Sequence, residues 1–198
     1  MQIGPQEVAL SPVELQTVEL QSVDLRPWQC GDEALAAAAA QFMSTTSLAN
    51  RFLAGTGGRL PAGYLRHITN GSRPTWDAYV AATDDHLIGW AEFGRIPADS
   101  PTADLAVIVA DPWQRRGIAS ALIRALLPRV AAAGVTHLGA DTLPGNRAIH
   151  GLLASLFGTR LDIAYEGGVV HYSLLVASAL PGKQADAPGA DAGRLVTV

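Results

Sequence analysis

The amino-acid sequence predicts a single domain of the α/β (α+β) class. Its 198 residues suffice for one domain with a full hydrophobic core and are too few for two. With 48% apolar and 16% charged residues, the chain has enough apolar surface to bury in a stable fold. The apolar residues change from helical spacing before Pro74 to short strand-like runs after it. We therefore expect helices and strands in the same domain.

The first part of the chain predicts one strand and three helices. Alternating apolar residues over 18–25 indicate a strand with a slip in its middle. Asp32 is expected to cap an alanine-rich helix. Residues 44–58 predict a second short helix that glycines end. Pro61 is expected to open a third helix, which ends near Ile68.

Strands and helices are then expected to alternate. The runs 77–83 and 87–95 flank a predicted hairpin turn. The uniformly apolar run 103–110 suits a central strand, which leads through a loop into a helix over 117–127. Pro128 is expected to kink or stop this helix. The remaining predicted elements are a strand, a helix and a closing hairpin, over residues 136–141, 146–157 and 161–176.

The two chain ends differ in composition from the rest. Proline, glycine and polar residues without a sustained period predict flexible tails over residues 1–16 and 179–198. Residues 17–178 are then expected to form the folded domain.

Charge and composition argue against several classes of protein. Fourteen basic residues against 18 acidic give a formal charge of -4, so we expect neither a nucleic-acid nor a membrane partner. The single cysteine, Cys30, excludes an intramolecular disulfide. Without a recognisable signal peptide or a run of 18 apolar residues, a cytoplasmic protein is expected. The only lysine, Lys183, lies in the predicted C-terminal tail, so a Walker-type phosphate loop cannot be built.

A candidate anion site lies where the central strand leads into the next helix. The first turn of a helix presents unpaired backbone N–H groups and a partial positive charge. Gly117 and Ala119 leave access to these groups open. Arg115 and Arg116 add two positive charges, which suits a diphosphate. The alternative is that Gly117 only permits a tight turn and that both arginines are solvated.

These residues resemble the acyl-CoA motif of the GNAT acyltransferase superfamily, Gln/Arg-x-x-Gly-x-Gly/Ala after an apolar strand. Gln114, Gly117 and Ala119 occupy its places. The resemblance extends over residues 18–176. It implies the GNAT fold, with a mixed, mostly antiparallel sheet of six to seven strands that is splayed between the fourth and fifth strands and flanked by about four helices. It also implies acetyl-CoA as the acyl donor.

The resemblance assigns donor-binding roles to three groups of residues. Backbone groups of the central strand would bind the pantetheine arm, the loop and first helical turn would bind the pyrophosphate, and an asparagine at the start of a later helix would contact the CoA. Asn146 could equally be an ordinary helix N-cap, and the two roles are compatible. The implied residues are Val107, Ile108, Val109, Gln114, Arg115, Arg116, Gly117, Ile118, Ala119, Ser120 and Asn146.

A shorter pattern resembles the Pat-type protein lysine acetyltransferases within this superfamily. Ser44, Ser47, Arg51 and Phe52 match the pattern Ser-x-x-Ser-x-x-x-Arg-Phe. Leu153 stands where many members that act on small molecules have a tyrosine acid. The resemblance implies a protein lysine as the acceptor. Helix capping by the serines and burial of the phenylalanine are the structural alternative.

Two carboxylates are candidates for the general base. A lysine amine with a pKa of about 10.4 is only about 0.04% neutral at pH 7, so a base helps it to attack a thioester. Asp104 begins the central strand, where Pat-like proteins carry a glutamate base. Glu92 lies on the preceding strand. Each carboxylate could instead be capped or solvated.

Other activities and partners stay open or are disfavoured. No spacing of histidines or cysteines predicts a metal site, and His137, His150 and His171 are expected to be structural. The acceptor could be a small amine instead of a lysine. A CoA-binding sensor without turnover is a second alternative, since Asp104 replaces the glutamate and Leu153 the tyrosine. The sequence is compatible with a homo-oligomer.

Overall fold

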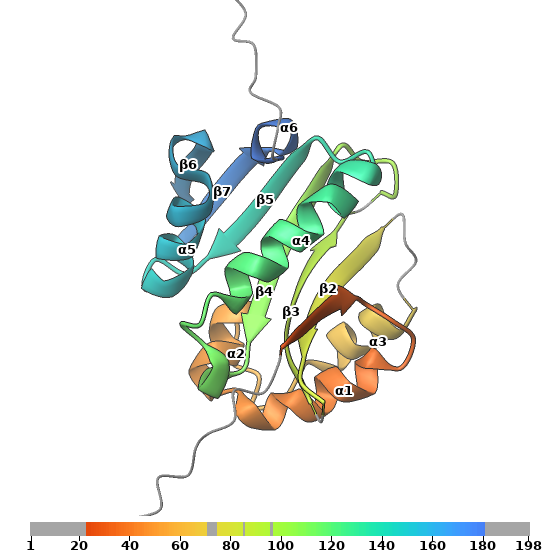
Figure 1. The fold of residues 1–198 in the computed structure, drawn as a ribbon. Coiled ribbons are helices and arrows are strands. Elements are labelled where there is room, and N and C mark those ends of the chain that lie inside the picture. Colours follow the sequence, from red (N-terminus) through yellow and green to blue (C-terminus); the bar gives the residue numbers. More distant parts are fainter. Residues whose placement is uncertain (1–22, 71–74, 85, 96, 181–198) are drawn as a thin grey trace, which may run out of the picture.

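A seven-stranded sheet organises the fold (Figure 1). The computed structural model describes residues 23–70, 75–84, 86–95 and 97–180. The strands are β1 (Asp24–Pro27), β2 (Trp76–Ala82), β3 (Leu87–Gly94), β4 (Thr102–Val109), β5 (His137–Thr142), β6 (Leu161–Glu166) and β7 (Val169–Leu175). Their order is β1-β2-β3-β4-β5-β7-β6, and every neighbouring pair is antiparallel except β4 and β5. The predicted mixed, mostly antiparallel sheet is confirmed.

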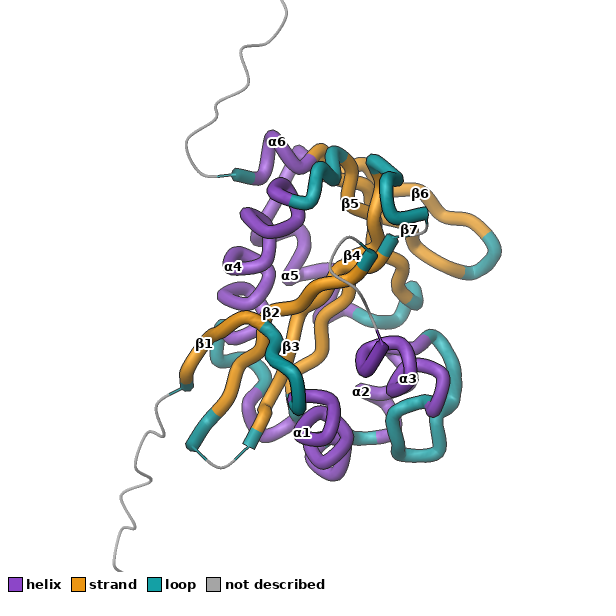
Figure 2. Tube along the Cα trace, turned by 90° about the vertical axis from the view of Figure 1, so that its right-hand side faces the viewer, coloured by secondary structure: helices purple, strands orange, loops and turns teal. Residues whose placement is uncertain are grey.

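Helices cover both faces of the sheet (Figure 2). They are α1 (Asp32–Ala39), α2 (Thr45–Phe52), α3 (Ala62–Asn70), α4 (Ile118–Ala132), α5 (Arg147–Phe157) and α6 (Val176–Ala179), with single 3₁₀ turns at Ala40–Phe42, Asp111–Trp113 and Gly158–Arg160. The described residues thus hold six α-helices, the last of them one turn long, where about four were expected. α1, α2 and α3 lie on one face of the sheet, and α4 and α5 lie on the other.

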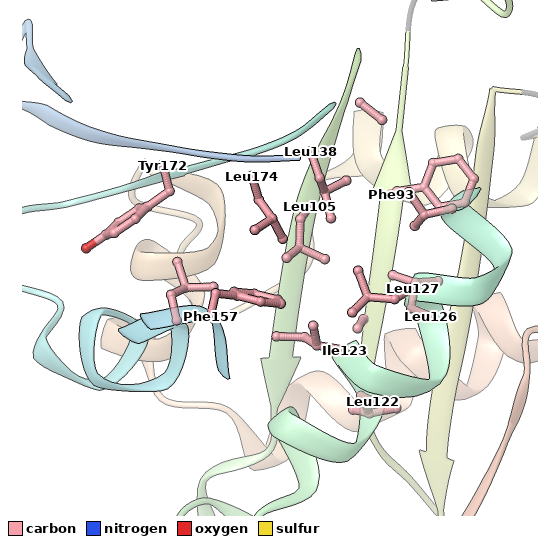
Figure 3. Packing of buried hydrophobic residues seen from close by; sticks show 14 of the residues in the cluster. Phe93, Leu105, Leu122, Ile123, Leu126, Leu127, Leu138, Phe157, Tyr172 and Leu174 are labelled. Carbon is pink, nitrogen blue, oxygen red and sulfur yellow. The ribbon is translucent and has the colours of Figure 1, made fainter. Parts of the chain in front are cut away.

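Two hydrophobic clusters separate these helices from the sheet. The side chains of Leu105 and Val109 on β4 join the cluster under α4 and α5, where side chains from β4, α4 and β7 meet (Figure 3). Ile108 points the other way and joins the cluster under α1 to α3. Because β4 buries side chains on both faces, its sequence is apolar without alternation. The prediction of a central strand here is confirmed.

The parallel pairing of β4 with β5 is short. It joins Thr102 to His137, Ala103 to Leu138 and Asp104 to Gly139 and then stops. Both strands continue past this point, β4 to Val109 and β5 to Thr142. They therefore separate after Asp104, which confirms the predicted splay.

The start of α1 differs from the prediction. Gly31, not Asp32, is the N-cap, and its φ of 99° is a left-handed conformation that favours glycine. Asp32 is the first helical residue, and its carboxylate accepts hydrogen bonds from Arg26 at 2.7 and 2.8 Å and from the Gln29 N–H at 2.8 Å. This ion pair ties α1 to β1. Of the strand predicted over 18–25, residues 18–22 lie outside the described residues.

Of the kink or stop expected at Pro128, the stop near Leu127 is wrong. α4 continues through Pro128 to Ala132. Pro128 and Arg124 both lie on the exposed side of α4, so the carbonyl of Arg124 that proline leaves without its helical donor can face water. Val130, one turn beyond the buried Leu126 and Leu127, is also fully buried, and this packing favours continuation of the helix.

The proposed domain limits stay a prediction. The tails expected over residues 1–16 and 179–198 lie outside the described residues, except for Ala179 and Leu180. Within the described residues, no helix is both long and apolar enough to cross a membrane.

Replacement of Pro128 by alanine is expected to stabilise the protein. Pro128→Ala restores a backbone N–H for the Arg124 carbonyl and removes the clash of the proline ring with the preceding turn. The gain, reduced by the greater freedom of the unfolded chain, should be about 2 kcal/mol in the free energy of unfolding. Urea unfolding measures it, with Arg124→Ala as a control on the same exposed face. An unchanged or lower stability of Pro128→Ala would contradict the analysis of α4.

Candidate active site

A cleft of about 660 Å³ opens where β4 and β5 separate. β4, β5, α2, α5 and the beginning of α4 contribute its walls. Most residues singled out from the sequence line it: Asp104, Val107, Ile108, Val109, Gln114, Arg115, Gly117, Ile118, Ala119, Ser120 and Asn146. Arg116 and Glu92 do not line the cleft. The fold thus gathers into one place residues that lie up to 105 positions apart in the sequence, from Ser47 to Leu152.

The edge of β4 that borders the cleft presents backbone groups from alternate residues. The N–H of Ala110 donates to the carbonyl of Ile88 at 2.8 Å, in line with the β3–β4 ladder. Because backbone groups alternate in direction along a strand, those of Ile108 point to β3 and those of Val107 and Val109 point into the gap. The part of the strand without a β5 partner can therefore bond to an extended ligand, chiefly through Val107.

The loop before α4 is held in an unusual backbone conformation. Arg115 has φ of 60° and Gly117, the N-cap of α4, has φ of 81°. A Cβ added to Gly117 would meet no atom within 4 Å. Glycine is therefore favoured here by its left-handed conformation and not by lack of space. The conformation brings Ile118, Ala119 and Ser120, whose N–H groups begin the helix, to the cleft.

Gln114 fastens this loop to the sheet. Its amide Nε2 lies 3.0 Å from the carbonyl of Val109, 3.0 Å from Oδ1 of Asp111 and 3.3 Å from Oγ of Ser47. The Gln114 amide group is therefore engaged in contacts within the protein, although the residue also borders the cleft. The candidate role of Gln114 is therefore to fix the loop against β4 and α2.

Asp111 connects α2 to the same loop. Its Oδ1 accepts a hydrogen bond from the Ser47 hydroxyl at 2.7 Å, and its Oδ2 accepts one from the Ser44 N–H at 3.2 Å. The Ser44 hydroxyl in turn accepts from the N–H of Ser47 at 3.1 Å and caps α2. The two serines singled out from the sequence thus hold α2 against the end of β4. Ser44 does so as the helix cap, and Ser47 does so through its hydrogen bond to Asp111.

Glu92 is the centre of a buried hydrogen-bond network. Its Oε2 accepts from the Tyr64 hydroxyl at 2.8 Å and from Trp76 Nε1 at 2.9 Å, and its Oε1 pairs with Arg51. Glu92 is 4% exposed. Trp90 Nε1 donates to the Tyr64 hydroxyl at 2.7 Å, and burial, followed by the charge of Glu92, raises the pKa of that hydroxyl well above its ordinary value. Both carboxylate oxygens are engaged, which disfavours this residue as a base.

Asp104 lies at the point where the strands part, with its carboxylate in the cleft. Its Oδ1 would be 3.3 Å from a Cβ on Gly139, so the absent side chain of Gly139 leaves room for it. Partial burial, followed by the charge of Asp141, raises the pKa of the Asp104 carboxyl. Of the two candidate carboxylates, Asp104 has access to the cleft and a raised proton affinity, as a general base requires.

Asp141 and Arg51 were not predicted to line the cleft. Asp141 is hydrogen bonded to His171, whose Nδ1 donates to Oδ1 at 2.7 Å. A signal for Asp141 exists in the sequence, because it ends the strand predicted over residues 136–141 and Asp104 lies on the strand predicted before it. The side chains of Asp141 and Asp104 both border the cleft between β4 and β5. In the described part of the chain, no three His, Cys, Asp or Glu side chains gather as metal ligands.

Both the sequence and the fold are similar to those of known proteins. The family described as the acetyltransferase (GNAT) family matches residues 42–158. No curated protein matches the sequence. The GNAT domain of S. lividans PAT has a similar structure, with a TM-score of 0.67 and 23% identity over 76% of this chain and 89% of that chain.

Two further solved structures share the fold. yncA of Salmonella typhimurium, solved with its cofactor acetyl-CoA, has a TM-score of 0.61 and 17% identity over 85% of this chain and 98% of that chain. A mutant of the cAMP-binding acyltransferase of Mycobacterium smegmatis has a TM-score of 0.55 and 24% identity over 78% of this chain. The chain spans 44% of that larger protein. At these identities the likeness concerns the fold.

Gly117→Val is expected to weaken the binding of CoA. Valine at φ of 81° is strained, and relief of the strain would move the N–H groups at the start of α4. We expect affinity for CoA to fall at least about tenfold, as strain of 1–3 kcal/mol allows. Isothermal titration calorimetry with CoA measures the loss.

Gly134→Val is the matched control for this variant. Gly134 follows α4 at its other end, has a φ of 78° and also has no atom within 4 Å of a built Cβ. It should therefore lose similar stability but keep its affinity for CoA. Equal affinities of the two folded variants would remove the anion-binding role from the beginning of α4.

Proposed function

Because the chain belongs to the GNAT acetyltransferase family, we propose that it transfers the acetyl group of acetyl-CoA to the side-chain amine of a protein lysine. The observation that carries this proposal is the cleft between β4 and β5, which has a free strand edge at its centre, a helix N-terminus at one end and a carboxylate at the other. The structure of yncA with acetyl-CoA supports the choice of donor.

The donor would lie along β4. From Asp104 to Val109 the strand advances roughly 17 Å, a distance that an extended arm would cover. The diphosphate would be bound by the N–H groups of Ile118 to Ser120 and by Arg115, at the end of the cleft near α4. The pantetheine arm would bond to the free backbone groups of Val107. The thioester would then lie near Asp104.

The chemistry needs a neutral amine and support for a negatively charged oxygen. The amine nitrogen attacks the thioester carbonyl carbon, the C–S bond breaks, and CoA leaves as a thiolate that takes up a proton. Asp104 would accept the proton of the amine through a water molecule, because its side chain is one methylene shorter than glutamate. A backbone N–H of β4 that points into the gap would stabilise the oxyanion. This route requires no covalent enzyme intermediate.

Charge and access at the Asp104 end of the cleft support a lysine acceptor. Asp104 and Asp141 lie there, and their carboxylates favour an approaching ammonium group. Ser173 on β7, which pairs with Gly139, is exposed on the same side of the sheet, so the approach is open. The likeness to the GNAT domain of S. lividans PAT and the serine-arginine pattern of α2 agree with this choice.

Asp104→Asn is expected to abolish most turnover but not donor binding. Asparagine keeps the shape of the side chain but cannot accept the proton. We expect kcat/KM at pH 7 to fall by about 10²-fold or more, and the deficit to shrink as the pH approaches the pKa of the amine. Thiol release from acetyl-CoA measures the rate. Asp162→Asn, which removes an exposed carboxylate from β6, serves as the control. Full activity of Asp104→Asn would exclude Asp104 as the base.

The nature of the acceptor can be tested with the unmodified protein. Thiol release is expected with lysine-containing peptides and proteins, and mass spectrometry should find the acetyl group on lysine side chains. Turnover restricted to small amines would replace the lysine assignment with a small-molecule one. If CoA binds and no amine supports thiol release, the protein is a CoA-binding sensor.

A further inference from the structure

Asp141 and His171 form a pair next to the candidate base. They lie directly opposite each other in the antiparallel register of β5 and β7. The Nδ1 of His171 donates to Oδ1 of Asp141 at 2.7 Å. Asp141 borders the cleft, and both side chains are open to solvent, with 53% of the Asp141 side chain and 39% of the His171 side chain exposed. The pair therefore lies at the solvent-exposed border of the cleft.

The sheet brings this pair to Asp104. Asp104 is the last residue of β4 that pairs with β5, and its partner is Gly139. Side chains two positions apart on a strand share a face, so Asp141 follows Gly139 on the face where the Asp104 carboxylate lies. Because Gly139 has no side chain, nothing from β5 stands between the two carboxylates. A negative charge on Asp141 therefore disfavours ionisation of Asp104.

The charges of the three groups depend on one another. Partial burial and then the charge of Asp141 raise the pKa of Asp104. The hydrogen bond to Asp141 raises the pKa of His171, with a smaller contribution from Glu166. A protonated His171 offsets the charge of Asp141, whereas a neutral His171 leaves that charge to act on Asp104.

We propose that Asp141 and His171 are positioning residues that control the charge state of Asp104. The proposal rests on the proposed function, in which Asp104 is the base. Asp141 strengthens Asp104 as a proton acceptor, because a second carboxylate nearby makes a proton on Asp104 more favourable. His171 limits this effect by holding Asp141 in an ion pair. A stronger base reduces the difference in pKa between Asp104 and an amine whose pKa is about 10.4, which makes the proton transfer less unfavourable.

The other charged and titratable groups near the pair are left unchanged in the Asp141 and His171 variants. Glu166 ends β6 close to His171, and His137 lies on the same face at the start of β5. Asp162 faces Ser173 from β6. From the α2 side, Arg51 borders the cleft but is paired with Glu92. Because Asp141→Asn and His171→Gln both keep these groups, a difference between the two variants does not come from them.

The proposal predicts opposite shifts from two neighbouring substitutions. In the protein labelled with ¹³C at aspartate carboxyls, the signal of Asp104 is assigned by its loss in Asp104→Asn and titrated without substrate. Asp141→Asn removes a negative charge and should lower the pKa of Asp104. His171→Gln removes a positive charge in acid solution and should raise the pKa of Asp104. The acid side of the kcat/KM profile should move in the same directions.

Asp162→Asn is the control and should leave the Asp104 titration unchanged, because its carboxylate lies on β6, two strands beyond β5. Shifts of the same sign in both variants, or no shift in either, would overturn the proposal. Circular dichroism and CoA titration check that each variant folds and binds. If the carboxyl titration moves as expected while Asp104→Asn stays active, the Asp141–His171 pair does control the charge state of Asp104, but Asp104 is not the base. If Asp104→Asn is inactive and the titration does not move, Asp104 remains the proposed base, and only the role of the Asp141–His171 pair is wrong.

Discussion

Three residue pairs join β4 to β5, and the position where this pairing stops determines the geometry of the site. A parallel pair that continued to Val109 would consume the backbone groups of β4 and close the cleft. Because it ends at Asp104, the same strand is fixed on one side by β3 and left available on the other. The separation costs backbone hydrogen bonds within the sheet. The buried side chains of β4 on both faces compensate for that loss.

The two sides of the cleft are held together by side chains from distant parts of the chain. Asp111 links the loop before α4 to α2, and the Arg51–Glu92 pair links α2 to β3. α2 is therefore attached at its beginning and near its end. Removal of one partner of the buried pair would leave an uncompensated charge, which is more costly than the net contribution of the pair suggests. Such fixed walls suit a site that must orient two substrates.

Most of the fold was predictable because its signals are local. The apolar run of β4, the glycine before α4 and the closing hairpin over residues 161–176 can each be predicted from a few neighbouring residues. Asp32 and Pro128 were misjudged because side-chain contacts and packing decided their roles: Arg26 binds the first, and packing of Val130 extends the helix past the second. The candidate cleft was predicted from the resemblance to GNAT proteins. The Asp141–His171 pair was not, because it depends on strand register, which periodicity does not reveal.

The distribution of tryptophans gives the protein a built-in optical reporter. Of its four tryptophans, Trp28, Trp76 and Trp90 are buried in the cluster under α1 to α3. Trp113 is half-buried, contacts the ring of Phe42 and borders the cleft beside the loop that precedes α4. The indole emission of this one residue therefore responds to the polarity of the cleft, while the other three provide a constant background. Occupancy of the site can be followed by fluorescence in the unlabelled protein.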